Sequence, residues 1–149
     1  MRHAWSLGST VAVITDDAQS EAAQLASMVI APELGADAVA GYINTKAGIA
    51  QKMILSMVAT GLAIRTGRVY SNLRVDLEAS NTKWVERQIA IVMEAEGCTR
   101  AVANAALESC SNNCKTAVLM VLTGLDAWKA HELLAQNNGF IRVALQEAP

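Results

Sequence analysis

The residues most able to do chemistry gather in one polar stretch, residues 44–52 with the sequence NTKAGIAQK, directly before a long apolar run. If that run is a helix, the polar stretch lies at its N-terminus, where free backbone N–H groups and the helix dipole favour an anion. Lys46 and Lys52 add positive charge there. The pattern indicates either a phosphate or carboxylate site or an ordinary polar helix start, and the residue types alone favour the ordinary helix start.

The apolar run, residues 53–64, carries hydrophobic or small side chains at almost every position. A helix without a polar face is buried on nearly all sides. We therefore expect a central core helix over residues 45–65, ended by Gly67. We also expect the run to be too short and too interrupted to span a bilayer, so no membrane partner is predicted.

The composition favours a helical protein that does not bind nucleic acid. Of its 149 residues, 52% are hydrophobic but only 4% are aromatic, which suits close-packed helices better than a β-sandwich. The net charge is −2 and the basic residues are scattered, so the clustered basic face of a nucleic-acid binder is missing.

The cysteines and the N-terminus indicate a soluble cytoplasmic protein. The three cysteines are Cys98, Cys110 and Cys114, and an odd number suits reduced, packed thiols. With His3 and His131 as the only histidines, the sequence offers no convincing ligand set, and we predict no metal site. The N-terminus lacks the long apolar segment of a signal peptide, so we expect cytoplasmic localisation.

Ahead of the expected core helix, the pattern predicts a strand at residues 10–15, a helix at 18–27 and a second strand at 28–31. Strand, helix and strand at this spacing form a βαβ unit, so the two strands should be parallel, and the first should be buried. Two parallel strands do not make a stable sheet. We therefore interpret the unit as the remnant of a larger doubly wound α/β domain, covered by helices or completed by a second copy.

The rest of the chain is expected to be mainly helical. Residues 33–43 form a loop, and residues 69–77 are ambiguous, with an irregular packed connection preferred over a strand. The C-terminal helices resemble a ubiquitin-associated-type three-helix module, a likeness of fold that does not imply ubiquitin binding. Three of the later helices are predicted to begin with an N-cap residue, which is Asn81 or Ser80 for the first, Thr99 for the second and Asp126 for the fourth. The predicted later helices cover residues 81–96, 100–109, 115–122, 126–136 and 140–146, and the predicted divisions are 1–45, 46–97 and 98–149.

Several separate sequence blocks, in order, resemble one known family. The first comprises Gly35-Ala36-Asp37, Lys46-Ala47-Gly48 and Gln51-Lys52. Their spacing is similar to a signature of the N-acetylmuramic acid 6-phosphate etherases and glucokinase regulatory proteins, and the likeness covers about residues 5–145. Further blocks are Gly67, Val69-Tyr70, Asn72-Leu73, Val75-Asp76, Ala79-Ser80-Asn81, the stretch 91–95 and the stretch 122–126.

The resemblance implies a sugar isomerase-type phosphosugar-binding domain followed by a helical C-terminal region. It also implies a homodimer with its active site near the subunit interface, and removal of the D-lactyl ether from N-acetylmuramic acid 6-phosphate. That reaction needs a pair of carboxylates and no metal or cofactor. In the family the catalytic glutamates and phosphate-binding loops lie in the first half, whereas this chain resembles the second half, so no residue here is assigned a catalytic role.

The signature departs from the family's at three positions. The family has Glu at Asp37, Ser at Tyr42 and Arg at Asn44. Losing the Arg removes a fixed bidentate donor for phosphate or carboxylate. For Asp37 we expect a loop-orienting role, and Lys52 is better explained as a solvated lysine. The candidate ligand-binding set is Asp37, Asn44, Lys46, Gly48, Gln51 and Lys52.

Three functions fit these observations, and the sequence leaves open whether the chain is an enzyme. The first is a truncated etherase relative that does not catalyse alone, but keeps an oligomer-forming core and weak phosphosugar binding. The second is half of a split etherase. The third is a regulatory module that senses a sugar phosphate or binds a protein.

Overall fold

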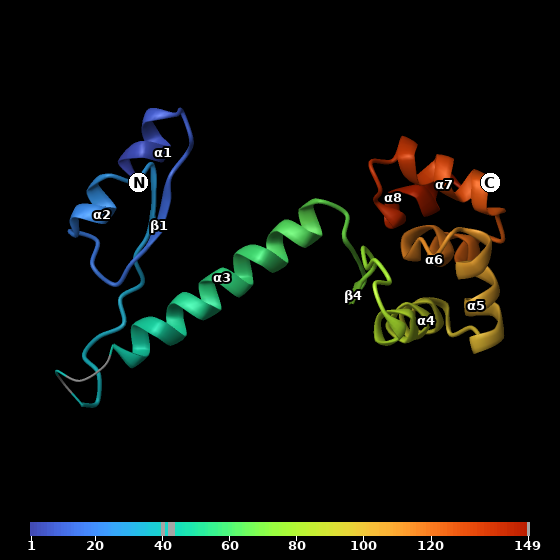
Figure 1. The fold of residues 1–149 in the computed structure, drawn as a ribbon, viewed down its shortest axis with the longest axis horizontal. Coiled ribbons are helices and arrows are strands. Elements are labelled where there is room, and N and C mark those ends of the chain that lie inside the picture. Colours follow the sequence, from blue (N-terminus) through green and yellow to red (C-terminus); the bar gives the residue numbers. More distant parts are fainter. Residues whose placement is uncertain (40, 42–43, 149) are drawn as a thin grey trace. The chain divides into compact units, whose positions relative to one another are not determined.

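The computed structural model describes residues 1–39, 41 and 44–148, and it is mainly helical, with four short strands in those residues (Figure 1). The chain divides into two compact units, Met1–Ala59 and Thr60–Pro149, and the division falls inside the longest helix. The two units are described separately below.

The first unit contains the predicted βαβ element in shortened form. Strand β1 (Ala12–Ile14) pairs with strand β2 (Met28–Ile30), and helix α2 (Glu21–Gln24) connects them. The register is parallel, which confirms the expected direction. The N-terminal helix α1 (Arg2–Ser6) is tied to α2 by an ion pair between Arg2 and Glu21 at 2.7 Å.

This unit has almost no core of its own. Among its described residues only Ala23 is buried, while Met28 and Val29 of β2 are exposed. The expectation of a buried first strand is therefore wrong for this chain, because Val13 and Ile14 are only half-buried. A sheet of two three-residue strands offers too little apolar surface to enclose its own side chains.

Helix α3 (Thr45–Arg65) has the predicted bounds but not the predicted surroundings. None of its residues is buried, and Met57 is 68% exposed. The expectation of a central core helix is thus wrong for the chain as described. The apolar pattern predicts burial, but the described residues do not bury this helix.

The expectation that this segment is too short for a membrane is also corrected. Because the helix begins at Thr45, ahead of the apolar run, it has 21 residues, and its most apolar 18-residue window has a mean hydropathy of 1.5. By length and composition alone it could cross a bilayer, and a single helix of this kind is weak evidence for a membrane protein.

The second unit opens with a hairpin where an irregular connection was preferred. Strand β3 (Val69–Tyr70) pairs antiparallel with β4 (Leu73–Arg74), and Ser71 turns between them with a φ of 54°. The preference was wrong because glycine is the usual sign of a tight hairpin turn, and neither turn residue, Ser71 or Asn72, is glycine.

Gly67, ahead of the hairpin, ends α3 as predicted and has a φ of 65°. An added Cβ there would lie 3.0 Å from the carbonyl oxygen of Gly139, so the position needs glycine for space as well as conformation.

Five helices complete the second unit close to their predicted positions. Side chains of the expected residues Asn81, Thr99 and Asp126 accept a hydrogen bond from the first turn of the helix that each precedes. Four of these helices follow residue 98, and their likeness to a ubiquitin-associated module stays a prediction. The helices are α4 (Thr82–Glu96), α5 (Arg100–Ser109), α6 (Cys114–Thr123), α7 (Ala127–Gln136) and α8 (Ile141–Glu147).

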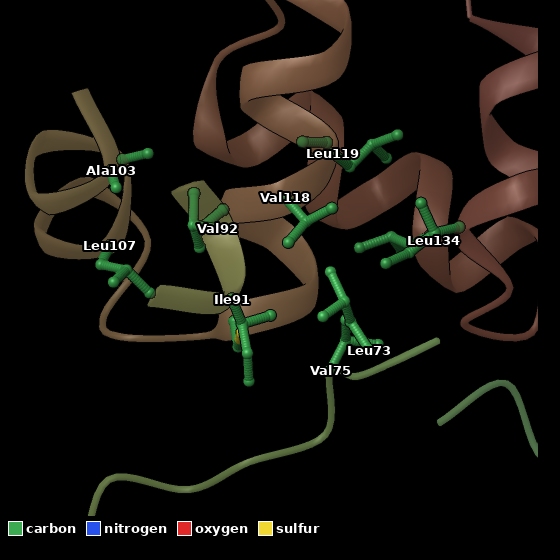
Figure 2. Close-up of a cluster of buried hydrophobic side chains, with 14 of the residues drawn as sticks. Leu73, Val75, Ile91, Val92, Ala103, Leu107, Val118, Leu119 and Leu134 are labelled. Carbon is green, nitrogen blue, oxygen red and sulfur yellow. The ribbon is translucent and has the colours of Figure 1, made fainter. Parts of the chain in front are cut away.

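Helix α6 is the centre of this unit and contacts α4, α5, α7 and α8. Its Val118 and Leu119 are fully buried. Figure 2 shows them among Val92 of α4, Leu107 of α5 and Leu134 of α7, with Leu73 and Val75 of the hairpin region below them in the view. The second unit therefore has a continuous apolar core.

We predict that Leu119→Ala lowers the free energy of unfolding of the second unit by about 2–5 kcal/mol, because it leaves a cavity in this core. The change is measured by urea denaturation followed by circular dichroism. The control is Val102→Ala on α5, where the side chain is 48% exposed and the loss should be well under 1 kcal/mol. Equal losses for both variants would contradict the core described here.

Candidate functional site

The polar stretch at the start of α3 lies beside the carboxyl ends of β1 and β2, within the first unit. Two cavities of about 260 and 360 Å³ are found there. Both are lined by Asp16, Leu34, Asn44 and Ala47, so they adjoin one another. In open α/β sheets this is the side on which ligands bind.

Lys46 and Asp37 lie close together, but they are hydrogen-bonded to each other, and Lys46 is also hydrogen-bonded to the preceding loop. The backbone N–H of Lys46 donates to Asp37 Oδ1 at 3.2 Å, so Asp37 satisfies a free donor in the first turn of α3. Lys46 Nζ donates to the carbonyl oxygen of Leu34 at 3.3 Å and to that of Ala36. In this arrangement the lysine charge stabilises the loop, and an anion would have to compete with two backbone carbonyls.

The other candidate residues divide between the two cavities. Gly48 and Gln51 line the smaller one, Lys46 and Asp37 the larger one, and Asn44 both. Lys52 lines neither and is exposed, in keeping with its interpretation as a solvated lysine. The departure at Tyr42 lies outside the described residues.

Asp16 is the site residue that the candidate set left out. It lines both cavities from the end of β1, and its position directly after a strand was the signal that could have found it. Around the larger cavity the formal charges are then two carboxylates, from Asp16 and Asp37, and one ammonium, from Lys46. This balance does not by itself favour a free anion. Among the described residues no group of three or more His, Cys, Asp or Glu side chains could hold a metal.

A third cavity, of about 520 Å³, lies in the second unit between residues 75–79 and residues 111–115. Gln88 is fully buried and ties the two walls together. Its Nε2 donates to the carbonyl oxygen of Leu77 at 2.6 Å and to that of Asn112 at 2.9 Å. The cavity is thus part of the framework that connects the hairpin region to the start of α6.

Asp76 on the wall of this cavity forms ion pairs with Arg74 at 2.8 Å and Arg68 at 3.5 Å. Burial raises the pKa of Asp76, but the hydrogen bond from Arg74 and the charges of both arginines lower it by more. Its pKa therefore lies below the ordinary value of 3.8. Burial also lowers the pKa of Lys115, whose Nζ donates to the carbonyl oxygen of Gly139 at 3.2 Å.

The cysteines lie in or beside the same helical core. Cys114 is buried at the start of α6, and burial raises the pKa of its thiol to about 12. At neutral pH this thiol is almost entirely protonated, so it packs as a small apolar group and is not a nucleophile.

We predict that Asp76→Asn destabilises the protein by about 1 kcal/mol at pH 7, because it removes an ion pair whose partners are partly exposed. Since the folded-state pKa is lowered, this stabilisation is present above pH 3.8 and is lost as the pH falls through the folded value. Urea denaturation at several pH values measures the difference.

The matched control for this prediction is Glu94→Gln, which removes an exposed carboxylate from α4. Its effect should be small at every pH. A difference between Asp76→Asn and the wild type that persists unchanged well below pH 3.8 would show that the carboxylate's charge does not stabilise the fold.

Comparison with known proteins points to one class, the N-acetylmuramic acid 6-phosphate etherases. The chain is 51% identical to the etherase of Klebsiella aerogenes over 145 residues, which is 97% of this chain and 48% of that protein. It is 50% identical to the etherase of Aliivibrio fischeri strain MJ11, with coverages of 99% and 49%. The etherase of Photorhabdus laumondii is 50% identical over 142 residues, with coverages of 95% and 47%. No protein-family model matches the chain.

The resemblance to the etherases, predicted from separate sequence blocks, is therefore confirmed. The sequence identity is about 50% over nearly the whole chain. The chain spans about half the length of the curated relatives it matches.

Proposed function

We propose that this chain is a truncated relative of N-acetylmuramic acid 6-phosphate etherase that does not cleave the ether alone. It keeps an oligomer-forming core and weak phosphosugar binding. The observation that carries the proposal is the contrast in coverage, because the likeness includes 97% of this chain but only 48% of the Klebsiella aerogenes relative. The family resemblance assigns the catalytic glutamates to the half that this likeness leaves out.

The arrangement at the start of α3 supports weak binding without catalysis. A phosphosugar in the adjoining cavities would meet the Lys46 ammonium and the amide side chains of Asn44 and Gln51. Asn44 stands where the family has Arg, so the planar guanidinium that can donate two hydrogen bonds to a phosphate is missing. Lys46 is already shared between two carbonyl groups. Both features lower the expected affinity.

The exposed apolar surface supports the proposed assembly. Large hydrophobic side chains exposed along α3 include Ile49, Met53, Leu55, Met57 and Val58. A patch of this kind is unusual for a monomer in water. We place the protein in the cytoplasm as a homodimer or higher oligomer, with a sugar isomerase-type fold in its first unit and a ubiquitin-associated-like fold in its last part.

Two alternatives have their own support. The near-complete likeness to etherases favours half of a split enzyme, which with its other half would add water across the ether to release D-lactate and N-acetylglucosamine 6-phosphate. The cavity between residues 75–79 and 111–115 favours a regulatory or protein-binding module, because it is polar and lies in the unit that has its own core.

We predict that the purified chain releases no D-lactate from N-acetylmuramic acid 6-phosphate above a buffer blank. A coupled lactate dehydrogenase assay measures the release, and the full-length Klebsiella aerogenes etherase is the positive control. Circular dichroism of the same sample shows that the chain is folded. Release well above the blank would mean that catalytic groups are present in this chain, and would overturn the proposal.

We predict that the chain binds N-acetylglucosamine 6-phosphate weakly, with a Kd of about 1 mM, equivalent to about −4 kcal/mol. Lys46→Ala should weaken this binding at least threefold, because the ammonium is lost from the larger cavity. Lys52→Ala, which removes an equal charge outside both cavities, is the control. Isothermal titration calorimetry measures both. Equal weakening by the two variants would indicate non-specific attraction.

A further inference from the structure

We propose that Asn138 and Gly139, in the turn that follows α7, form a site of spontaneous covalent modification, and that the conformation of this turn controls how fast the reaction runs. The reaction is deamidation, in which the backbone nitrogen of one residue attacks the side-chain amide of the residue before it. Asn138 and Gly139 are the only Asn–Gly pair in the sequence. Because glycine has no Cβ, its nitrogen can approach the preceding amide with little hindrance.

The two neighbouring asparagines in this turn differ in how their side chains are held. Asn137 is buried, and its Nδ2 donates to the carbonyl oxygen of Leu133 at 3.0 Å and to a carboxylate oxygen of Glu147 at 2.9 Å. Asn138 is exposed, and its side chain has no hydrogen-bond partner among the described residues. The amide carbon of Asn138 is therefore open to attack, whereas that of Asn137 is fixed inside the second unit.

The attacking nitrogen is held by the last turn of α7. The N–H of Gly139 donates to the carbonyl oxygen of Leu134 at 2.7 Å, and the N–H of Asn138 donates to that of Ala135 at 3.3 Å. Asn138 has a φ of 52°, in the left-handed region that commonly ends a helix through this pair of hydrogen bonds. The attack requires the Gly139 nitrogen to lose its proton, which here is bound to Leu134. The folded turn is therefore protected from the reaction.

Contacts with other elements of the second unit hold the turn in this conformation. Lys115 Nζ, at the start of α6, donates to the carbonyl oxygen of Gly139 at 3.2 Å. The same oxygen lies 3.0 Å from the position that a Cβ of Gly67 would occupy. Helix ends open locally at a much lower free energy than the whole fold. We therefore expect the reaction to run when the last turn of α7 opens, without unfolding of the second unit.

The reaction consumes only water and releases ammonia. The Gly139 nitrogen forms a bond to Cγ of Asn138, and the bond from Cγ to Nδ2 breaks. Nδ2 leaves as ammonia and carries away the proton of the attacking nitrogen, so the intermediate is a cyclic succinimide. Water then opens the ring at either of its carbonyl carbons, which leaves aspartate or isoaspartate at this position.

Either product changes the end of α7. Aspartate adds a negative charge beside the C-terminus of a helix, where the helix dipole disfavours it. Isoaspartate adds a carbon to the main chain ahead of Gly139, so the hydrogen bonds to Leu134 and Ala135 cannot both keep their present spacing. The Gly139 carbonyl that contacts Lys115 and approaches Gly67 is displaced with them. The modification therefore loosens the packing of this turn against α6 and Gly67.

The test follows deamidation of the 149-residue chain at neutral pH by peptide mapping and mass spectrometry, both folded and in guanidinium chloride. In the unfolded chain Asn138 should be the first asparagine converted, and in the folded chain its conversion should be at least tenfold slower. The slowing should be no smaller than that of hydrogen exchange at the Gly139 N–H, because both processes require release of the hydrogen bond to Leu134. Equal rates in the two states, a smaller slowing, or earlier conversion of another asparagine would overturn the proposal.

Matched variants test whether contacts of the turn set the rate. Lys115→Met removes the hydrogen bond to the Gly139 carbonyl and should speed the conversion of Asn138 in the folded chain at least threefold. Lys129→Met, which removes an exposed lysine near the start of α7, should leave the rate unchanged. Circular dichroism shows whether each variant is folded, and if Lys115→Met is not, the wild-type comparison with hydrogen exchange decides alone. Equal rates in both folded variants would show that Lys115 does not hold the turn closed.

Discussion

The structure depends on one constraint, which is that a helix with an apolar surface all round must be enclosed. Helix α3 has that surface and no buried residue. Hydrophobic burial is worth about 25 cal/mol per Å² of apolar area. Several large side chains exposed along one helix therefore represent a substantial free energy that only further contacts can recover. The short parallel sheet beside it has the same need, because sheets of this kind are stable when both faces are covered.

In the second unit, unlike the first, an apolar helix is enclosed by its neighbours. Helix α6 is as apolar as α3 in sequence, but four neighbouring helices enclose it, and Val118 and Leu119 are fully buried. The amide nitrogen of the buried Gln88 donates to the carbonyl groups of Leu77 and Asn112. The comparison indicates that an apolar sequence alone does not decide whether a helix is buried.

Local structure could be predicted from the sequence because its causes are local. The capping residues Asn81, Thr99 and Asp126 each precede a helix that begins where expected, and the bounds of α3 agree residue for residue. The parallel pairing of β1 and β2 followed from the strand–helix–strand order. Burial could not be predicted in the same way, because it depends on which other elements are present.

The candidate site likewise has features that the sequence predicted and features that it did not. Asn44, Lys46 and Gln51 do line adjoining cavities at the carboxyl ends of the strands, as the position of the polar stretch indicated. That Lys46 donates to the carbonyl groups of Leu34 and Ala36 depends on a loop conformation without a periodic sequence pattern. These contacts decide whether the lysine charge is available to a ligand, and they are visible only in three dimensions.

The candidate site and the exposed apolar surface belong to the same helix, α3. The helix that supplies the N–H bound by Asp37 is the same helix whose apolar surface is exposed. Any partner that encloses α3 also restricts the positions of Lys46 and of the loop that it holds. A conformation that frees the Lys46 ammonium from the carbonyls of Leu34 and Ala36 would have to replace those hydrogen bonds, since unpaired polar groups near a covered surface are costly. Ligand binding and enclosure of α3 are therefore thermodynamically coupled wherever enclosure changes those bonds, and the affinity of the isolated chain for a phosphosugar does not set the affinity of the assembled protein.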